Sequence, residues 1–153
     1  MLIENEFTVA ATRKDVADFL LTPERMLPCV PGLEDFEIQE DGTCRARLKA
    51  RVGPVSATFS GDVQLDGSEA PARIRATARG KDRFTGSTVQ VVLESSLSET
   101  EPGVTTVCNG AELTLRGRLA RFGSSVIRPI SEDMIDKFAN CVHSELAGGN
   151  KYE

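Results

Sequence analysis

The chain is poor in the residues on which catalytic and metal sites usually depend. Its 153 residues include no tryptophan, one tyrosine and one histidine, His143. No apolar run approaches the roughly 20 residues needed to cross a bilayer. The opening MLIENEFTVA lacks the basic-then-apolar layout of a signal peptide. These absences predict a cytoplasmic chain that does not itself span a membrane.

The four cysteines, Cys29, Cys44, Cys108 and Cys141, form no CxxC pair and match no zinc template. His143 follows Cys141 by two residues, and positions i and i+2 of a helix face different directions, so these two would not share a metal. We therefore expect four buried, reduced thiols and no metal site. Cys29 lies between two prolines in LPCVPG, without a nearby histidine or second cysteine. We expect it to be a small apolar residue at a cavity rim rather than a nucleophile.

Catalytic motifs are also absent: the sequence contains no HExxH, GxSxG, P-loop or GxGxxG pattern. His143 falls off the apolar stripe of its segment, so we expect it to face solvent. The net charge of −5 gives no general attraction to nucleic acid. The sequence therefore predicts no catalytic residue and no nucleic-acid partner.

Hydrophobic periodicity predicts the order of the elements. A first strand is followed by a short helix that Thr12 caps, then by a helical turn, six strands of period two and a long helix with apolar residues every three or four positions. Pro129 interrupts this last helix, where we expect a kink or break. The expected ranges are 2–10, 13–21, 24–27, 33–39, 43–52, 55–65, 72–80, 87–99, 104–117 and 118–146.

This order predicts an α+β fold of the helix-grip type. A long helix with an apolar stripe needs a concave surface to cover the stripe, and a curved antiparallel sheet provides one. We therefore expect a seven-stranded antiparallel sheet wrapped around the C-terminal helix, with two short helices after the first strand. Residues 1–147 form one domain in this prediction, and residues 148–153 form a flexible tail.

Small residues dominate the predicted inner face of the sheet. Nine of the sixteen inward positions on the three strands between residues 44 and 80 are Ala, Gly or Cys. Such a face either admits large side chains from the helix or leaves a cavity for a ligand, and we favour the cavity. Ser95, Thr105 and Asn109 are inward candidates for polar contacts, although each could instead bond the backbone nearby. The predicted cavity residues are Cys29, Ala46, Leu48, Ala57, Phe59, Ile74, Ala76, Asn109, Phe122, Ile127, Met134 and Phe138.

The outer face of the same strands is basic. Residues 43–83 contain nine Lys or Arg and four Asp or Glu, in a chain with a net charge of −5. The patch is either a solvated sheet face or a surface that docks on an acidic protein or an anionic membrane. The predicted docking residues are Arg45, Arg47, Arg51, Arg73, Arg75 and Arg79.

Three stretches carry a resemblance to a known family. They are Thr22-Pro23 with the LPCVPG segment, VGPVSATFSG from Val52 to Gly61, and the segment Gly117–Gly123 with Phe138 later in the same helix. Together they resemble the family of the carbon monoxide dehydrogenase G subunit, within the START and Bet v 1-like (SRPBCC) superfamily. The resemblance covers nearly the whole chain.

The resemblance implies a non-catalytic accessory protein. Such proteins accompany molybdenum hydroxylases of the carbon monoxide dehydrogenase type, assist their membrane recruitment or maturation, and bind a quinone- or lipid-like molecule. The chain would then need no cofactor besides that ligand and would work in the cytoplasm, with peripheral contact at the inner face of the membrane. Two alternatives remain: a small enzyme of the cyclase or hydratase kind that uses the same cavity, and a pure protein-interaction module with a filled core.

Overall fold

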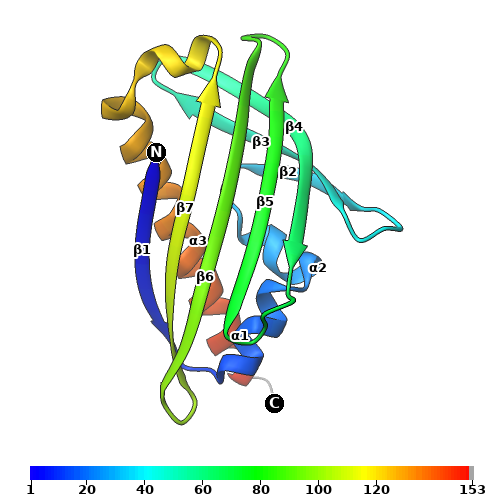
Figure 1. Ribbon diagram of the computed structural model, residues 1–153, viewed down its shortest axis with the longest axis vertical. Coiled ribbons are helices and arrows are strands. Elements are labelled where there is room, and N and C mark those ends of the chain that lie inside the picture. The colour runs from blue at the N-terminus through cyan, green and yellow to red at the C-terminus, as the bar shows by residue number, and fades with distance from the viewer. Residues whose placement is uncertain (152–153) are drawn as a thin grey trace.

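The computed structural model describes the backbone of residues 1–151 and the side chains of residues 1–147. Seven antiparallel strands form one sheet in the order β1-β7-β6-β5-β4-β3-β2, and the long helix α3 lies on its concave side (Figure 1). The predicted helix-grip architecture is confirmed. The elements are β1 (Leu2–Val9), α1 (Arg13–Leu20), α2 (Pro23–Met26), η1 (Leu27–Cys29), β2 (Leu33–Ile38), β3 (Cys44–Val52), β4 (Val55–Asp66), β5 (Arg73–Asp82), β6 (Ser87–Glu101), β7 (Val104–Arg116), η2 (Arg118–Phe122) and α3 (Ser124–Lys151).

The short helices close one end of the grip. As predicted, Thr12 caps α1, and its hydroxyl accepts a hydrogen bond from the Asp15 amide at 3.1 Å. The other face of α1 buries Val16, Phe19 and Leu20. α2 begins at Pro23, whose fixed φ suits a first helical turn.

The long helix begins later than predicted and is not broken at Pro129. Residues 118–122 form the separate 3₁₀ helix η2, and the chain turns at Gly123, which has φ +72°. Pro129 lies inside α3, in its second turn. It removes one hydrogen bond, to the carbonyl of Ser125 in the exposed first turn, where water can replace it. The break in the predicted helix therefore lies at Gly123, where glycine allows the turn between η2 and α3, and not at Pro129.

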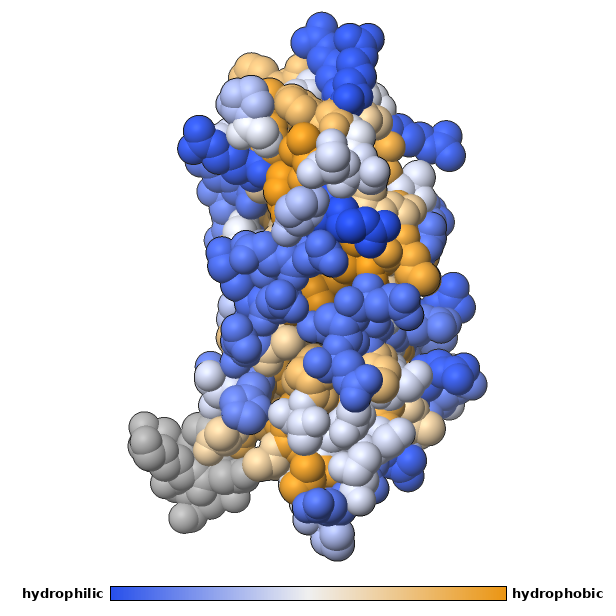
Figure 2. All heavy atoms as spheres, turned by 90° about the vertical axis from the view of Figure 1, so that its left-hand side faces the viewer, coloured by the Kyte–Doolittle hydropathy of each residue, from blue (hydrophilic) through white to orange (hydrophobic). Residues whose placement is uncertain are grey.

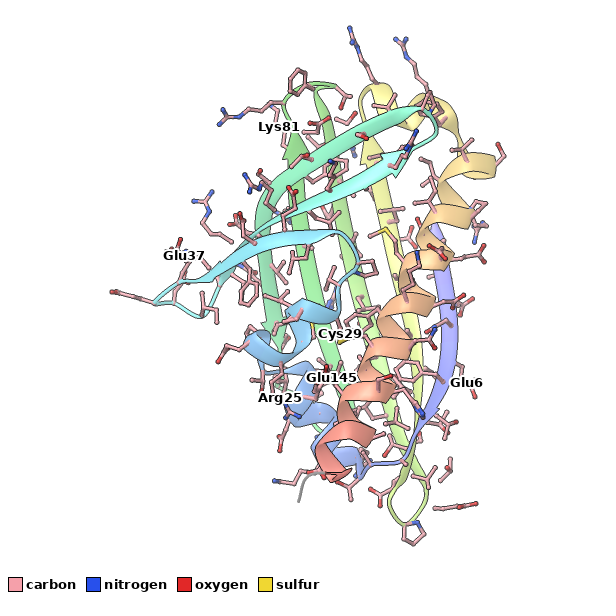
Figure 3. All side chains as sticks on the ribbon, turned by 180° about the vertical axis from the view of Figure 1, so that it is seen from behind. Glu6, Arg25, Cys29, Glu37, Lys81 and Glu145 are labelled. Carbon is pink, nitrogen blue, oxygen red and sulfur yellow. A yellow bond between two sulfur atoms is a disulfide. The ribbon has the colours of Figure 1, made fainter. Side chains whose placement is uncertain are left out.

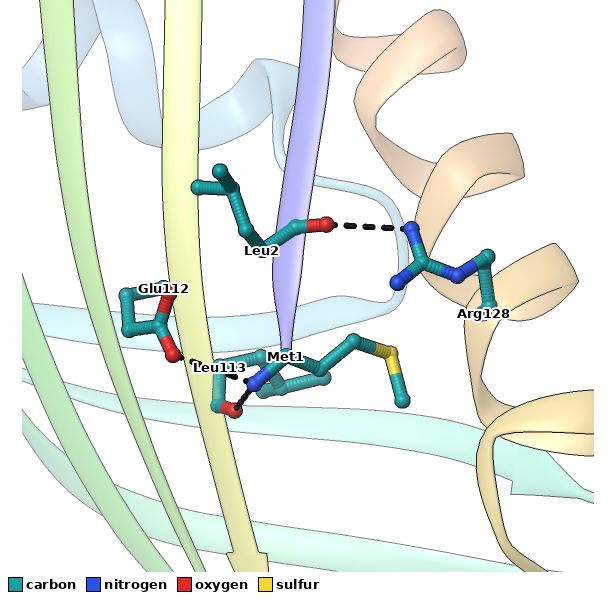
Figure 4. A network of polar contacts seen from close by, with 5 residues as sticks. All are labelled: Met1, Leu2, Glu112, Leu113 and Arg128. Atoms are coloured by element: carbon teal, nitrogen blue, oxygen red, sulfur yellow. Dashed lines mark hydrogen bonds and ion pairs between the residues drawn. The ribbon is translucent and has the colours of Figure 1, made fainter.

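The first turns of α3 are tied to the edge of the sheet (Figure 4). The Arg128 guanidinium donates a hydrogen bond to the Leu2 carbonyl at 3.0 Å. The N-terminal ammonium of Met1 lies 3.1 Å from Glu112 and 2.9 Å from the Leu113 carbonyl. These contacts join α3 to β1 and β1 to β7, so the helix is anchored along one side of the sheet.

The apolar core has two parts. One cluster lies between α1, η1 and the C-terminal half of α3 and includes Phe19, Leu27 and Val142. The other surrounds η2 and the start of α3 and includes Phe59, Leu119 and Ile127. Between the two clusters the small inward residues of the sheet leave space unfilled.

The backbone of α3 runs to Lys151, through most of the segment 148–153 for which the sequence predicts a flexible tail. Residues 152–153 lie outside the described residues, and the flexibility of this segment stays a prediction. Among the helices that the structure describes, none is both long enough and apolar enough to cross a membrane.

Asp82 organises the turn between β5 and β6. Its carboxylate is buried and accepts hydrogen bonds from the Thr85 hydroxyl at 2.7 Å and from the amides of Thr85 and Phe84. Burial opposes the charge, but these bonds together hold the pKa of Asp82 below its ordinary value of 3.8. The turn is therefore built around an ionised carboxylate.

Replacing Asp82 with asparagine is expected to lower the melting temperature by a few degrees at pH 7. Because the pKa of Asp82 is lower in the folded state than in the unfolded state, its contribution is present above about pH 4 and is lost as the pH falls further. Melting curves of both proteins at pH 7 and pH 3 check this. A difference in melting temperature that is as large at pH 3 as at pH 7 would contradict it.

Candidate functional site: an apolar cavity in the grip

A cavity of about 350 Å³ lies between α3 and the concave face of the sheet. This volume is at the lower end of the range typical of small-molecule sites. Strands β3 to β7 give mainly inward-facing apolar side chains to its wall. β1 and β2 add Ile3 and Leu33, and α3 gives one face of its first four turns. The space therefore has the character of a ligand pocket rather than of a packing defect.

The structure brings eight of the twelve predicted cavity residues together around this space. They are Ala46, Leu48, Phe59, Ala76, Asn109, Ile127, Met134 and Phe138. They come from β3, β4, β5, β7 and α3. The small side chains Ala46 and Ala76 leave the volume that the larger residues of α3 do not fill.

The other four predicted residues do not line the cavity. Ala57 and Ile74 face inward, but each belongs to one of the packed clusters at the ends of the sheet. Phe122 lies in η2 and would be 3.0 Å from a Cβ placed on Gly53, so it covers the β3–β4 turn. Cys29 is buried beside the cavity but is bonded to another cysteine. The alternation along each strand thus correctly predicts which side chains of the sheet face inward. Whether an inward residue lines the cavity or packs in the core depends on its position along the strand.

Asn109 supplies a fixed polar point in the wall. Its side-chain oxygen accepts a hydrogen bond from the Ser95 hydroxyl, and its amide nitrogen donates to Asn5 at 2.8 Å. Asn109 and Ser95 are buried. Thr105, the third predicted polar residue, instead donates to the Ala11 carbonyl at 2.7 Å and takes no part in the cavity. The amide of Asn109 is therefore oriented by its neighbours.

Sequence reasoning placed Asn109 of β7 and Cys29 of the LPCVPG segment at the cavity, but it missed the apolar lining residues of β6 and β7 and the neighbours of Cys29. The inward positions of β6 and β7 line the cavity with the same odd-numbered alternation that identified the inward residues of β4, so the signal was present. The neighbours of Cys29 line it too, for which the sequence offered no pattern. The missed residues include Leu27, Val30, Pro31, Val89, Val91, Leu93, Ala111, Leu113 and Leu115.

The LPCVPG segment forms one wall of the cavity and is held from both sides. Gly32 has φ +82°, and its carbonyl accepts a hydrogen bond from the Lys49 amide at 2.8 Å. A side chain at this position would overlap the Lys49 carbonyl, so the segment can approach β3 only with glycine here. Gly32 thus allows the chain to turn from η1 into β2.

The prediction of four reduced thiols is wrong for two of them. Cys29 and Cys141 form a disulfide that joins η1 to α3, visible in Figure 3 beside the label of Cys29. The two cysteines are 112 residues apart in the sequence, so only the fold brings them together. The disulfide lies next to the cavity wall. Val30 and Pro31, which follow Cys29, and Phe138, one helical turn before Cys141, all line the cavity. Cys29 is therefore a covalent link behind the cavity wall rather than an unreactive apolar residue at its rim.

The two remaining cysteines are free, Cys44 buried and Cys108 exposed. Burial, and to a smaller extent the Glu24 carboxylate, raises the pKa of the Cys44 thiol, which favours its protonated form. His143 is exposed, as predicted. Among the described residues, no three His, Cys, Asp or Glu side chains lie close enough to hold a metal ion.

The six predicted docking arginines all lie exposed on the outer face of the sheet, but acidic neighbours accompany most of them. Ion pairs join Arg45 to Asp62 at 3.6 Å, Arg47 to Asp35 at 2.7 Å, and Arg75 to Glu94 at 3.7 Å. Arg73 pairs with Glu69 on the same side. Cross-strand pairing therefore neutralises much of the charge that the sequence places on this face, and the docking role stays a prediction.

Comparison with solved structures finds proteins with a similar fold. A conserved protein from Geobacillus kaustophilus has a TM-score of 0.86 and 15% identity, over 97% of this chain and 96% of that one. A START superfamily protein from Mycobacterium smegmatis has a TM-score of 0.69 and 12% identity, over 96% and 97%. The Zhui aromatase/cyclase from Streptomyces sp. R1128 has a TM-score of 0.62 and 18% identity, over 97% and 98%. At these identities the likeness establishes the fold alone.

Comparison with curated proteins finds no match. Comparison with family models finds one, described as the G subunit of carbon monoxide dehydrogenase (CoxG), which matches residues 6–147. The match runs from β1 to α3 and includes every residue that lines the cavity except Ile3. The chain belongs to the CoxG family.

Proposed function

We propose that the chain is a non-catalytic accessory protein that holds a hydrophobic, quinone- or lipid-like molecule in the cavity of the grip. The observation that carries the proposal is the chemistry of the wall. Four residues of the lining are polar or charged. The side chains of Asp62 and Arg79 are directed to the outer face of the sheet, so Asn109 and Ser131 are the polar side chains on the cavity side. An apolar space with a single oriented amide suits a largely hydrocarbon molecule that carries a carbonyl or hydroxyl group.

The same wall argues against acid–base catalysis in the cavity. A cyclase or hydratase needs a titratable group directed at the substrate, with a pKa matched to its task. Within the described residues the lining offers an amide and a hydroxyl, and the Ser131 hydroxyl already donates to the Ile127 carbonyl at 2.9 Å. The similarity to an aromatase/cyclase lies in the fold, so the binding role has the better support.

Filling the cavity tests the proposal. Ala76→Phe places a ring in the space, and we expect it to weaken the binding of decyl-substituted benzoquinone by at least about tenfold. Isothermal titration calorimetry suits the measurement, because the chain has no tryptophan whose fluorescence could report binding.

The matched control is Thr77→Phe, which adds the same ring one residue along β5, on the opposite face of the sheet. Both variants need melting curves, because overpacking a core costs about 1–3 kcal/mol. If Ala76→Phe binds as tightly as the wild type while remaining folded, the ligand does not occupy this cavity.

We further propose that the chain assists a molybdenum hydroxylase of the carbon monoxide dehydrogenase type, as its family membership suggests. Affinity purification of the tagged protein from its native host, followed by mass spectrometry and molybdenum analysis, tests this association. Recovery of the chain without molybdenum or hydroxylase components, under conditions in which the enzyme is expressed, would contradict it.

We propose the inner face of the cytoplasmic membrane as its place of action. The disulfide removes one argument for a reducing compartment, because stable disulfides are rare in the cytosol. Fractionation of host cells, with the thiols alkylated at lysis, would give both the compartment and the oxidation state of Cys29 and Cys141. Recovery among exported proteins would overturn the proposed location.

A further inference from the structure

The turn between β5 and β6 presents an aromatic ring to solvent. Phe84 is 96% exposed, far more than the two other exposed large hydrophobic residues of the described chain, Leu2 at 48% and Ile38 at 40%. The turn that carries it is ordered by the Asp82 hydrogen bonds, one of them from the amide of Phe84 itself. The ring is therefore held outward at one end of the molecule.

Five cations lie at the same end of the molecule as this ring. Lys81 and Arg116 lie on one cross-strand row of the outer face, joined through Thr88, and Arg83 is in the turn itself. η2 packs against the same turn, because the Leu119 amide donates to the Ser87 hydroxyl at 3.0 Å. This contact brings Arg118 and Arg121 to the same end. We call Lys81, Arg83, Phe84, Arg116, Arg118 and Arg121 the basic tip.

The charge of the basic tip is unpaired. All five cations are exposed, and in the part of the chain that the structure describes none of them forms an ion pair. The carboxylate within the tip is that of Asp82, which is buried and committed to the turn. Elsewhere on the outer face most of the arginines have acidic partners, and the whole chain has a net charge of −5. The available positive charge is therefore concentrated where Phe84 protrudes.

The outer face has room for anionic groups beside the tip. A hollow of about 620 Å³ is lined by Lys81 and Arg116 of the tip and by Arg45 and Arg79, with Asp62 as its one carboxylate. Figure 2 keeps the vertical axis of Figure 1, and at its upper end, where the β5–β6 turn lies, hydrophilic side chains protrude beside hydrophobic surface. Figure 3 shows Lys81 at this same end, remote from the short helices.

We propose that the basic tip docks the protein on an anionic phospholipid bilayer. The Phe84 ring enters the boundary between headgroups and acyl chains, where aromatic residues are favoured, and the five cations contact lipid phosphates. An acidic protein partner fits the geometry less well, since a stable protein interface covers roughly 800 Å² on each side and the tip is a protruding turn. This docking rests on the proposed place of action at the membrane. It is separate from ligand binding in the cavity, so either can fail without the other.

The orientation that follows is specific. Cavity residues at this end of the grip include Val52 in β3, Val89 in β6 and Leu115 in β7. The short helices lie away from this end, and Cys29 of the disulfide lies near the middle of the molecule (Figure 3). Docking through the basic tip therefore turns this end of the cavity toward the membrane and leaves α1 and α2 facing away from it.

Sedimentation with sucrose-loaded vesicles tests the proposal. Vesicles of phosphatidylcholine with roughly 30% phosphatidylglycerol are compared with vesicles of phosphatidylcholine alone, in roughly 0.1 M salt, where surface charge is screened within about 10 Å. We expect the wild type to bind the anionic vesicles and not the neutral ones. Phe84→Ser should weaken binding about tenfold, and the double variant Arg118→Glu/Arg121→Glu at least about 20-fold.

Matched controls carry the same chemical changes elsewhere. Lys14→Glu/Lys137→Glu reverses two exposed charges on α1 and α3, away from the tip, and Ile38→Ser removes another exposed apolar side chain. Both should bind like the wild type. Equal loss in the controls, absence of wild-type binding to the anionic vesicles, or equal binding to both kinds of vesicle would each overturn the proposal. Soluble polyglutamate or duplex DNA could also be added as a competitor for vesicle binding. If either competes equally well with the wild type and with Phe84→Ser, the tip is a general polyanion site and the proposal is overturned.

Discussion

The double variant Cys29→Ala/Cys141→Ala is expected to lose about 3 kcal/mol of its free energy of unfolding. The disulfide closes a loop between residues 112 apart in the sequence, and cross-linking such distant residues restricts the unfolded chain strongly. Urea denaturation monitored by circular dichroism measures the change. Dithiothreitol should lower the stability of the wild type to that of the variant and should leave the variant unchanged.

Cys108→Ala is the appropriate control, because it removes a free, exposed thiol and leaves the disulfide intact. We expect its unfolding free energy to remain within about 0.5 kcal/mol of the wild type. If the double variant is as stable as the wild type in oxidising buffer, the cross-link does not form in solution.

Loss of the disulfide should also weaken the binding of a ligand in the cavity. Leu27, Val30 and Pro31 line it from the side of Cys29, and Met134 and Phe138 line it from the side of Cys141. The link therefore holds together two adjoining parts of the wall, η1 and α3. If the proposed ligand binds there, the reduced protein should bind it more weakly than the oxidised protein, although both are folded.

The architecture was predictable because the alternation of polar and apolar residues along each strand shows which side chains face inward. The alternation along β3, with Arg45, Arg47 and Arg51 out and Leu48 and Val52 in, is set locally by the pleat. The same holds for the short helices, whose caps and prolines are adjacent in sequence. Local rules of this kind do not depend on which strands become neighbours, so the element order could be derived before the sheet was known.

Features that depend on distant pairs were not predictable in this way. The Cys29–Cys141 disulfide requires the register of α3 against η1, which no local pattern encodes. The neutralisation of Arg45 by Asp62 requires the pairing of β3 with β4. The basic tip requires the β5–β6 turn, the end of β7 and η2 to meet, so Phe84 was unremarkable in the sequence although its exposure distinguishes it in the fold.

The curvature that creates the cavity depends on a second pair of this kind, Gly61 and Gly80, which lie opposite each other in β4 and β5. The pairing of β4 with β5 begins at Ser60, whereas its pairing with β3 runs back to Val55, so the N-terminal part of β4 follows β3 alone. Figure 1 shows β4 bending away from β5 there. A side chain on Gly61 would overlap the Arg79 carbonyl oxygen and lie 2.6 Å from the Gly80 Cα. The strands can therefore be this close at the bend only without a Cβ.

Gly61→Ala is accordingly expected to cost at least about 3 kcal/mol of unfolding free energy, because the obstacle is backbone and cannot rotate aside. Gly110→Ala in β7 is the matched control, since the nearest atom to its new methyl group would be a Leu2 side-chain carbon at 4.0 Å. That substitution should be neutral or stabilise by up to about 1 kcal/mol, through the unfolded state. Equal stability of Gly61→Ala and the wild type in urea would mean that the bend can relax, and that the small residues of the inner face, rather than the curvature of the sheet, keep the cavity open.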